Sequence, residues 1–149
     1  MPAPKSVTKI NKDGVTFVSS VDRAEHTITE LSRAALRDTA KFLRRQIITK
    51  LKKLPGMKYH RRPYTGTQYW VRKRETDLQI GFAHDAWYSA RSELGDSKTP
   101  GRHILRDTVY ENIDQIRIIQ GQYLSAIEDD NRAKGLIDEK EAVSGDAED

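Results

Sequence analysis

Residues 28–54 read ITELSRAALRDTAKFLRRQIITKLKKL, and this stretch decides the fold because its apolar side chains recur every three or four positions. That spacing places them on one face of an α-helix. The apolar positions are Ile28, Leu31, Ala35, Leu36, Ala40, Leu43, Ile47, Leu51 and Leu54. Ser19, Ser20 or Asp22 offers an N-cap, and Pro55-Gly56 closes the run. The sequence therefore predicts one long amphipathic helix from about Val21 to Leu54.

Short β-type segments lie on both sides of this helix. Residues 7–18 surround the turn Asn11-Lys12-Asp13-Gly14, and Asp-Gly between apolar runs favours a hairpin. Residues 68–74 and 78–82 predict a second hairpin, with Leu78, Ile80 and Phe82 on one face.

A last helix is predicted from about Asp107 to Ile127, because apolar residues again recur at helical spacing. Ile104-Leu105-Arg106 fits either a short strand or the lead into that helix. The order of elements predicts an α+β fold, in which the long helix and the C-terminal helix pack on one small antiparallel sheet.

The chain of 149 residues has the usual size of one domain, and 32% of it is charged. Residues 1–127 carry 23 Lys/Arg and 13 Asp/Glu, whereas residues 128–149 carry 3 and 9. We expect residues 1–127 to form a single α+β domain that includes the hairpin at about 7–18. We expect residues 128–149 to be an acidic tail that is flexible or ordered by a partner.

Several classes of protein are disfavoured by what the sequence lacks. It has no cysteine, no signal peptide and no apolar run of membrane-spanning length, so we expect a protein of a reducing cytoplasm without membrane contact. The four histidines are scattered, His84-Asp85 is best interpreted as an exposed turn, and no phosphate-binding glycine loop or nucleophile elbow occurs. We expect no metal, no cofactor and no enzymatic activity.

Cationic residues dominate the end of the long helix and the loop after it. Nine Lys/Arg and no acid occur between Lys41 and Arg62. Such a run is either a solvated face or a contact for DNA phosphates or an acidic protein. No motif for base readout accompanies it, so any DNA contact would be independent of sequence. The candidate contacts are Lys41, Arg44, Arg45, Lys52, Lys53, Arg61 and Arg62.

Residues 87–106 read WYSARSELGDSKTPGRHILR and combine an aromatic pair, an acid and a polar loop. We expect Trp87 and Tyr88 to pack against apolar groups. The Glu93 carboxylate either accepts hydrogen bonds from backbone amides of the following loop or pairs with an arginine. Trp70 and Trp87 are more typical of core or interface anchors than of stacking platforms.

In this order the motifs resemble the tail-completion or minor tail component family of long-tailed bacteriophages. The resemblance covers about residues 21–127, and the chain departs from the family pattern at Leu94, Asp96 and His103-Ile104. After the long helix it rests on Thr65-Gly66, Tyr69-Trp70, Ile80-Gly81-Phe82, Trp87-Tyr88, Glu93-Leu94-Gly95, Ser97-Lys98, Pro100 and Ile104-Leu105-Arg106.

The resemblance implies a small structural subunit that forms a homo-oligomeric ring of about six copies at the junction of head and tail. Such a ring completes or terminates the tail tube and joins it to the head connector, in the virion and, during assembly, in the host cytoplasm. Its partners are then the head-completion or connector protein, the tail tube protein and DNA that passes through the channel without sequence recognition. The implied subunit or partner contacts are Thr65, Tyr69, Trp70, Trp87, Tyr88, Glu93, Lys98 and Arg102.

A different class of function stays open beside this one. The cationic residues between Lys41 and Arg62 also fit a free nucleic-acid-binding protein without sequence preference. Isolated subunits would then bind DNA tightly and in a salt-dependent manner, whereas a ring protein would self-associate or bind its neighbours. A small nuclease is disfavoured, because no acidic pair lies near the cationic residues.

Overall fold

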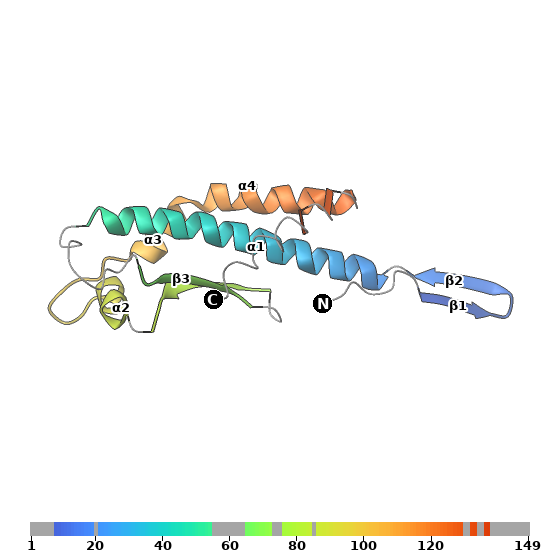
Figure 1. The fold of residues 1–149 in the computed structure, drawn as a ribbon, viewed down its shortest axis with the longest axis horizontal. Helices are drawn as coiled ribbons and strands as arrows, with labels where there is room; N and C mark the ends of the chain where they lie inside the picture. The colour runs from blue at the N-terminus through green and yellow to red at the C-terminus, as the bar shows by residue number, and fades with distance from the viewer. Residues whose placement is uncertain are drawn as a thin grey trace. The chain divides into compact units, whose positions relative to one another are not determined.

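The structure is a computed structural model that describes residues 8–19, 21–54, 65–72, 76–84, 86–129, 132–133 and 136–137. Its elements are helices and antiparallel strands, most of which Figure 1 labels, so the fold is mixed α+β as predicted. The described strands form two separate two-stranded sheets, where the sequence analysis expected one. The chain divides into two compact units, unit 1 with residues 1–35 and 121–149 and unit 2 with residues 36–120. The expectation of one domain over residues 1–127 stays a prediction.

Unit 1 begins with the predicted hairpin. Strand β1 (Thr8–Lys12) pairs antiparallel with β2 (Val15–Ser19), and Lys12 lies opposite Val15. The turn residues Asp13 and Gly14 have φ angles of 55° and 78°. Two positive φ values in a two-residue loop match the right-handed twist of the strands, which explains why Asp-Gly predicted this hairpin correctly.

The long helix α1 (Val21–Lys52) confirms the prediction from apolar spacing. Its buried residues repeat with helical periodicity in both units, although Ile28, predicted on the same face, is 43% exposed. In unit 1 they are Leu31, Ala34 and Ala35, and in unit 2 they are Thr39, Ala40, Leu43, Ile47 and Leu51.

The core of unit 1 also receives residues from the end of the chain. Tyr123 near the end of α4 (Ile113–Leu124), Ala126 in the 3-10 helix η1 (Ser125–Glu128) and Ala133 are all buried. The acidic tail predicted from Glu128 lies largely outside the described residues.

Unit 2 contains the second predicted hairpin, formed by β3 (Thr67–Val71) and β4 (Leu78–Phe82). Strand β3 is shorter than the predicted 68–74, since Arg72 follows it as irregular chain and residues 73–74 lie outside the described part. The Arg44 side chain fixes the hairpin to α1, because its Nε donates a hydrogen bond of 2.9 Å to the backbone carbonyl of the buried Thr67.

The helix predicted at 107–127 is divided. Helix α3 (Ile104–Glu111) ends at Asn112 and α4 follows, so Ile104-Leu105-Arg106 is the first turn of a helix and not a strand. The Asn112 side chain donates a hydrogen bond of 2.8 Å to the Thr108 carbonyl. Asparagine side chains compete in this way with the helical backbone pattern, which accounts for the break.

Candidate functional site

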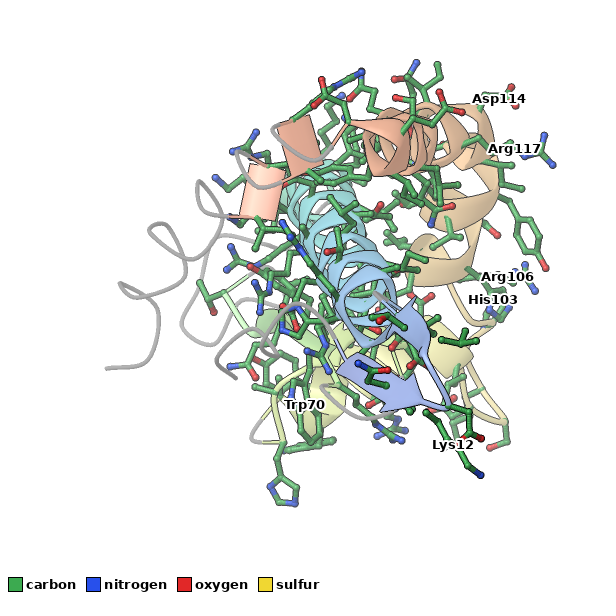
Figure 2. The ribbon with its side chains drawn as sticks, turned by 90° about the vertical axis from the view of Figure 1, so that its right-hand side faces the viewer. Lys12, Trp70, His103, Arg106, Asp114 and Arg117 are labelled. Atoms are coloured by element: carbon green, nitrogen blue, oxygen red, sulfur yellow. The ribbon has the colours of Figure 1, made fainter. Side chains whose placement is uncertain are left out.

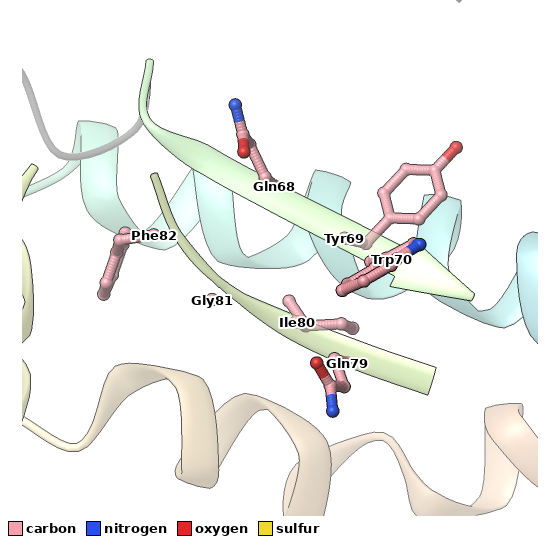
Figure 3. Close-up of a pocket in the computed structure, with 7 residues that line it drawn as sticks. All are labelled: Gln68, Tyr69, Trp70, Gln79, Ile80, Gly81 and Phe82. Atoms are coloured by element: carbon pink, nitrogen blue, oxygen red, sulfur yellow. The ribbon is translucent and has the colours of Figure 1, made fainter. Parts of the chain in front are cut away.

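The outward face of the β3–β4 hairpin carries an exposed indole. Alternation along the strands places Gln68 and Trp70 on this face together with their partners Gly81 and Gln79. Trp70 is 65% exposed (Figure 2). Because Gly81 has no side chain and nothing lies within 4 Å of its missing Cβ, the face is hollowed beside the indole. This first hollow has a volume of about 260 Å³ (Figure 3).

Arg72 is held against Trp70 by neighbouring groups. Its guanidinium lies 6.0 Å from the centroid of the Trp70 ring, within cation–π range. Its Nε lies 3.8 Å from Asp77 Oδ1, and the Gln79 side-chain oxygen accepts from Nε at 3.2 Å when that amide is oriented to satisfy both groups. Trp70 and Arg72 therefore form an ordered surface pair, and both residue types are enriched among the energetic centres of protein interfaces.

A second hollow of about 370 Å³ adjoins the first, since Gly81 and Phe82 line both. Its walls come from β4, from α2 (Trp87–Leu94) and from Leu105 in α3. Trp87 and Leu94 line it yet are 63% and 75% exposed. The expectation that Trp87 packs against apolar groups is thus wrong, although its ring meets Tyr88 edge-on at 6.1 Å between centroids.

The loop after α2, residues 95–102, is held by two carboxylates and is named here the braced loop. Glu93 Oε2 accepts the backbone N–H of Ile104 at 2.8 Å, and Oε1 accepts that of Leu105 at 2.7 Å. Of the two predicted roles for Glu93, acceptance from backbone amides is confirmed. Since these amides begin α3 and lack helical acceptors, the carboxylate serves as a helix cap from outside the helix.

Asp96 braces the same loop from within. Its Oδ1 accepts the backbone N–H groups of Lys98 and Thr99, each at 2.8 Å, and its Oδ2 accepts Arg91 Nε at 2.7 Å. The Lys98 amide, the Arg91 guanidinium and the Thr99 amide together hold the pKa of Asp96 below its usual value. The sequence analysis named Asp96 only as a departure from the family pattern and missed this role.

Two glycines close the base of the braced loop. A Cβ on Gly95, whose φ is +82°, would lie 2.4 Å from the backbone nitrogen of Gly101. A Cβ on Gly101 would lie 2.6 Å from the Glu93 carbonyl oxygen. The loop thereby holds the side chains of Ser97, Lys98, Thr99, Pro100 and Arg102 in an exposed position.

The other residues that the resemblance implies as subunit or partner contacts differ in their exposure. Thr65 is exposed in the turn before β3, whereas Tyr69 is half-buried on the inward face of the hairpin. Tyr88 is half-buried in α2. Tyr69 and Trp70 line the first hollow, and Trp87 and Glu93 line the second, so the structure brings these four residues to adjoining hollows of unit 2.

The candidate cationic contacts belong to two sets. Arg44 is committed to Thr67, and Lys50, also on α1, forms an ion pair with Glu111. Lys53 is exposed just after α1, and Arg61 and Arg62 lie outside the described residues. A second set lies within about 80° of arc on α1, roughly opposite the buried Leu43, and is named the basic stripe. The basic stripe consists of three predicted contacts, Lys41, Arg45 and Lys52, together with Arg37, which was not among the predicted contacts; Arg45 and Lys52 are exposed.

Within the described ranges, no group of three or more His, Asp or Glu side chains is arranged to hold a metal ion. His84 is exposed in a turn, as predicted. None of the described helices is both long enough and apolar enough to cross a membrane. Comparisons with family models, curated proteins and solved structures found no match to this chain.

Proposed function

We propose that this chain is a structural protein of a tailed bacteriophage, which forms a homo-oligomeric ring at the neck. The ring completes or terminates the tail tube and joins it to the head connector, without catalysing a reaction. The observation that carries the proposal is the surface of unit 2, where two adjoining hollows carry the exposed Trp70 and Trp87. The second hollow is also lined by Glu93, Leu94 and Leu105, which precede and follow the braced loop. The resemblance of residues 21–127 to the tail-completion family supports this kind of assembly.

Exposure of large aromatic side chains to water costs free energy. Large aromatic side chains gain free energy when a partner covers them, and they are the commonest energetic centres of interfaces. A loop whose backbone is fixed before binding loses little conformational entropy when it is contacted. Trp70, Trp87 and the braced loop therefore suit a permanent contact with a second copy or a neighbouring neck protein.

The basic stripe fits the same proposal. In a ring through which DNA passes, Arg45 and Lys52 would face phosphates without reading bases. A few such contacts give weak binding that falls steeply with salt, which suits DNA that must slide.

The test is the mass of the purified protein by light scattering, alone and with isolated tail tubes. We expect a ring or capped tubes for the natural sequence, and loss of both for the double variant Trp70→Ala/Trp87→Ala. Tyr110→Ala/Ile118→Ala is the matched control, because these residues are 67% and 53% exposed but line neither hollow. A monomer that does not bind tubes would contradict the proposal. Equal losses of assembly in both variants would show that the two hollows are not the assembly surface.

A second candidate is a free nucleic-acid-binding protein without sequence preference, and the basic stripe is the observation that favours it. For about four phosphate contacts, the logarithm of the association constant should fall with the logarithm of salt concentration with a slope near −3.6. Tight binding of duplex DNA by a monomer at physiological salt would favour this candidate over the ring.

A further inference from the structure

Strand β4 has an outer edge, on the side that faces away from β3 (Figure 3). The Arg72 amide donates to the Asp77 carbonyl, so these two residues form a hydrogen-bonded pair of the ladder. Such pairs alternate along antiparallel strands, so Gln79 and Gly81 also bond to β3. The residues between them direct their backbone groups to the outer edge, and they are Leu78, Ile80 and Phe82.

The two edges of this hairpin differ in what occupies them. The edge of β3 is engaged, because the Thr67 carbonyl accepts Arg44 Nε at 2.9 Å. Within the residues that the structure describes, no hydrogen bond engages the outward N–H and C=O groups of β4. An unpaired strand edge is a template for a further strand. The place for such a strand in unit 2 is therefore the edge of β4.

A second copy of the chain presents the same edge, and one register makes the two edges complementary. When Ile80 lies opposite Ile80 of the second copy, each Leu78 lies opposite a Phe82, and all three outward residues of both strands are paired. Each such pair exchanges two hydrogen bonds, about six in all. We propose that two copies pair antiparallel through β4 in this register, which joins the two hairpins into one four-stranded sheet.

The inward side chains fit the same register. Leu78, Ile80 and Phe82 share the inward face of the hairpin, so pairing joins the apolar rows of both copies across the new strand pair. Leu78 of the second copy lies beside Phe82, which lines the second hollow together with Trp87 and Leu105. This hollow therefore offers apolar walls to the incoming leucine.

The outward side chains fit it as well. In this register Gln79 of the second copy lies opposite Gly81, where nothing lies within 4 Å of the missing Cβ. The first hollow, which exists because Gly81 has no side chain, thus receives a side chain from the other copy. Both hollows are filled by the same pairing.

The inference goes beyond the proposed neck ring. A two-fold pair is closed on itself and does not build a ring. The pairing therefore belongs to copies outside the ring, where it covers an edge that would otherwise promote aggregation.

The first experiment reads the register by disulfide formation, for which the chain is suited because it has no cysteine. Gln79→Cys and Gly81→Cys are mixed under mild oxidation, and the dimers are identified by mass spectrometry. Positions 79 and 81 of the two copies form a pair without mutual hydrogen bonds, with Cα atoms about 4.5 Å apart, which a disulfide can bridge. Two copies of the same variant place their cysteines diagonally, about 7–8 Å apart, which is too far.

The mixed disulfide should therefore dominate over both homodimers. This excess should be lost when Gln68→Cys replaces Gly81→Cys, because Gln68 is exposed on the same face but belongs to β3. Mixed and homodimeric disulfides in the proportions of random collision would overturn the proposal. Since the disulfide reports strand register and not the mass of an assembly, its result does not depend on whether a ring forms.

A second measurement uses the natural chain without substitution. The exchange of the Leu78, Ile80 and Phe82 amides with deuterium should slow as the protein concentration rises. The Gln79 and Gly81 amides are the internal control, because they bond to β3 and should stay protected at every concentration. Rapid exchange of the three edge amides at every concentration would overturn the pairing, and so would slow exchange in a protein with the mass of a monomer.

Discussion

The carboxylate of Glu93, near the end of one helix, caps the backbone of Leu105 in the first turn of another, with 2.7 Å between Oε1 and the amide nitrogen. Oε2 takes the neighbouring amide of Ile104 in the same manner. One side chain thereby satisfies two N–H groups that α3 itself leaves without acceptors, and its negative charge lies at the positive end of that helix. The contact fixes where α3 begins relative to α2.

Replacement of Glu93 by glutamine should lower the free energy of unfolding by about 1–2 kcal/mol, because an amide retains one acceptor but loses the charge and the second acceptor. Chemical denaturation monitored by circular dichroism measures this. Glu25→Gln is the control, since Glu25 is exposed and should stay within about 0.5 kcal/mol of the natural protein. Equal effects of the two changes would show that the cap contributes nothing.

The lowered pKa of Asp96 predicts a pH dependence with a definite sign. A carboxylate whose folded pKa lies below the unfolded value of 3.8 contributes its stabilisation above that value and loses it as the pH falls through the folded pKa. The amide proton shifts of Lys98 and Thr99 should therefore titrate with a midpoint below 3.8. The melting temperatures of the natural protein and of Asp96→Asn should differ at neutral pH and converge in strong acid. A midpoint at or above the ordinary value would disprove the bracing role.

Glycine substitutions should have opposite effects in two places. Gly95→Ala puts a Cβ 2.4 Å from the Gly101 nitrogen at a positive φ, and should cost more than about 2 kcal/mol. Gly121→Ala, in helix α4 with nothing within 4 Å of the new Cβ, should add about 0.5–1 kcal/mol. Thermal unfolding of both variants decides this, and a neutral Gly95→Ala would mean that the loop is not closed as described.

Substitutions of two adjacent arginines on α1 should affect different properties, stability for Arg44 and DNA affinity for Arg45. Arg44→Ala leaves the carbonyl of the buried Thr67 without its charged donor and should cost about 1.5–3 kcal/mol. Arg45→Ala should leave stability within about 0.5 kcal/mol but weaken duplex DNA binding at low salt. Paired denaturation and fluorescence anisotropy measurements test both. If Arg45→Ala lowered stability and Arg44→Ala lowered DNA affinity, the stabilising contact would belong to Arg45 and not to Arg44.

Much of the fold could be predicted because strong periodic signals decide it. Apolar residues at helical spacing identified α1, the Asp-Gly turn identified the first hairpin, and alternation of apolar residues identified the second. Helix α2 was not predicted, because its eight residues carry no apolar period and it leaves Trp87 and Leu94 exposed. The break at Asn112 depends on a bond from a side chain to the backbone, which residue patterns alone do not reveal.

The candidate site was predictable only in part. The acceptor role of Glu93 was one of two alternatives, because an acid before a glycine-rich loop suits either backbone amides or an arginine. Asp96 was missed, although an aspartate at the start of a short polar loop is a known signal for side-chain bonds to amides two residues on. The position of Trp70 beside Gly81 required the strand register, which no single stretch of sequence contains.

In the braced loop, the residues that hold the backbone conformation are different from the residues whose side chains are exposed. Its backbone depends on Glu93, Asp96 and the two glycines, whereas the side chains of residues 97–100 are exposed and take no part in that geometry. Loops held by a rigid scaffold tolerate sequence change at their exposed positions. We therefore expect residues 97–100 to accept substitution without change of fold, while the four supporting residues do not.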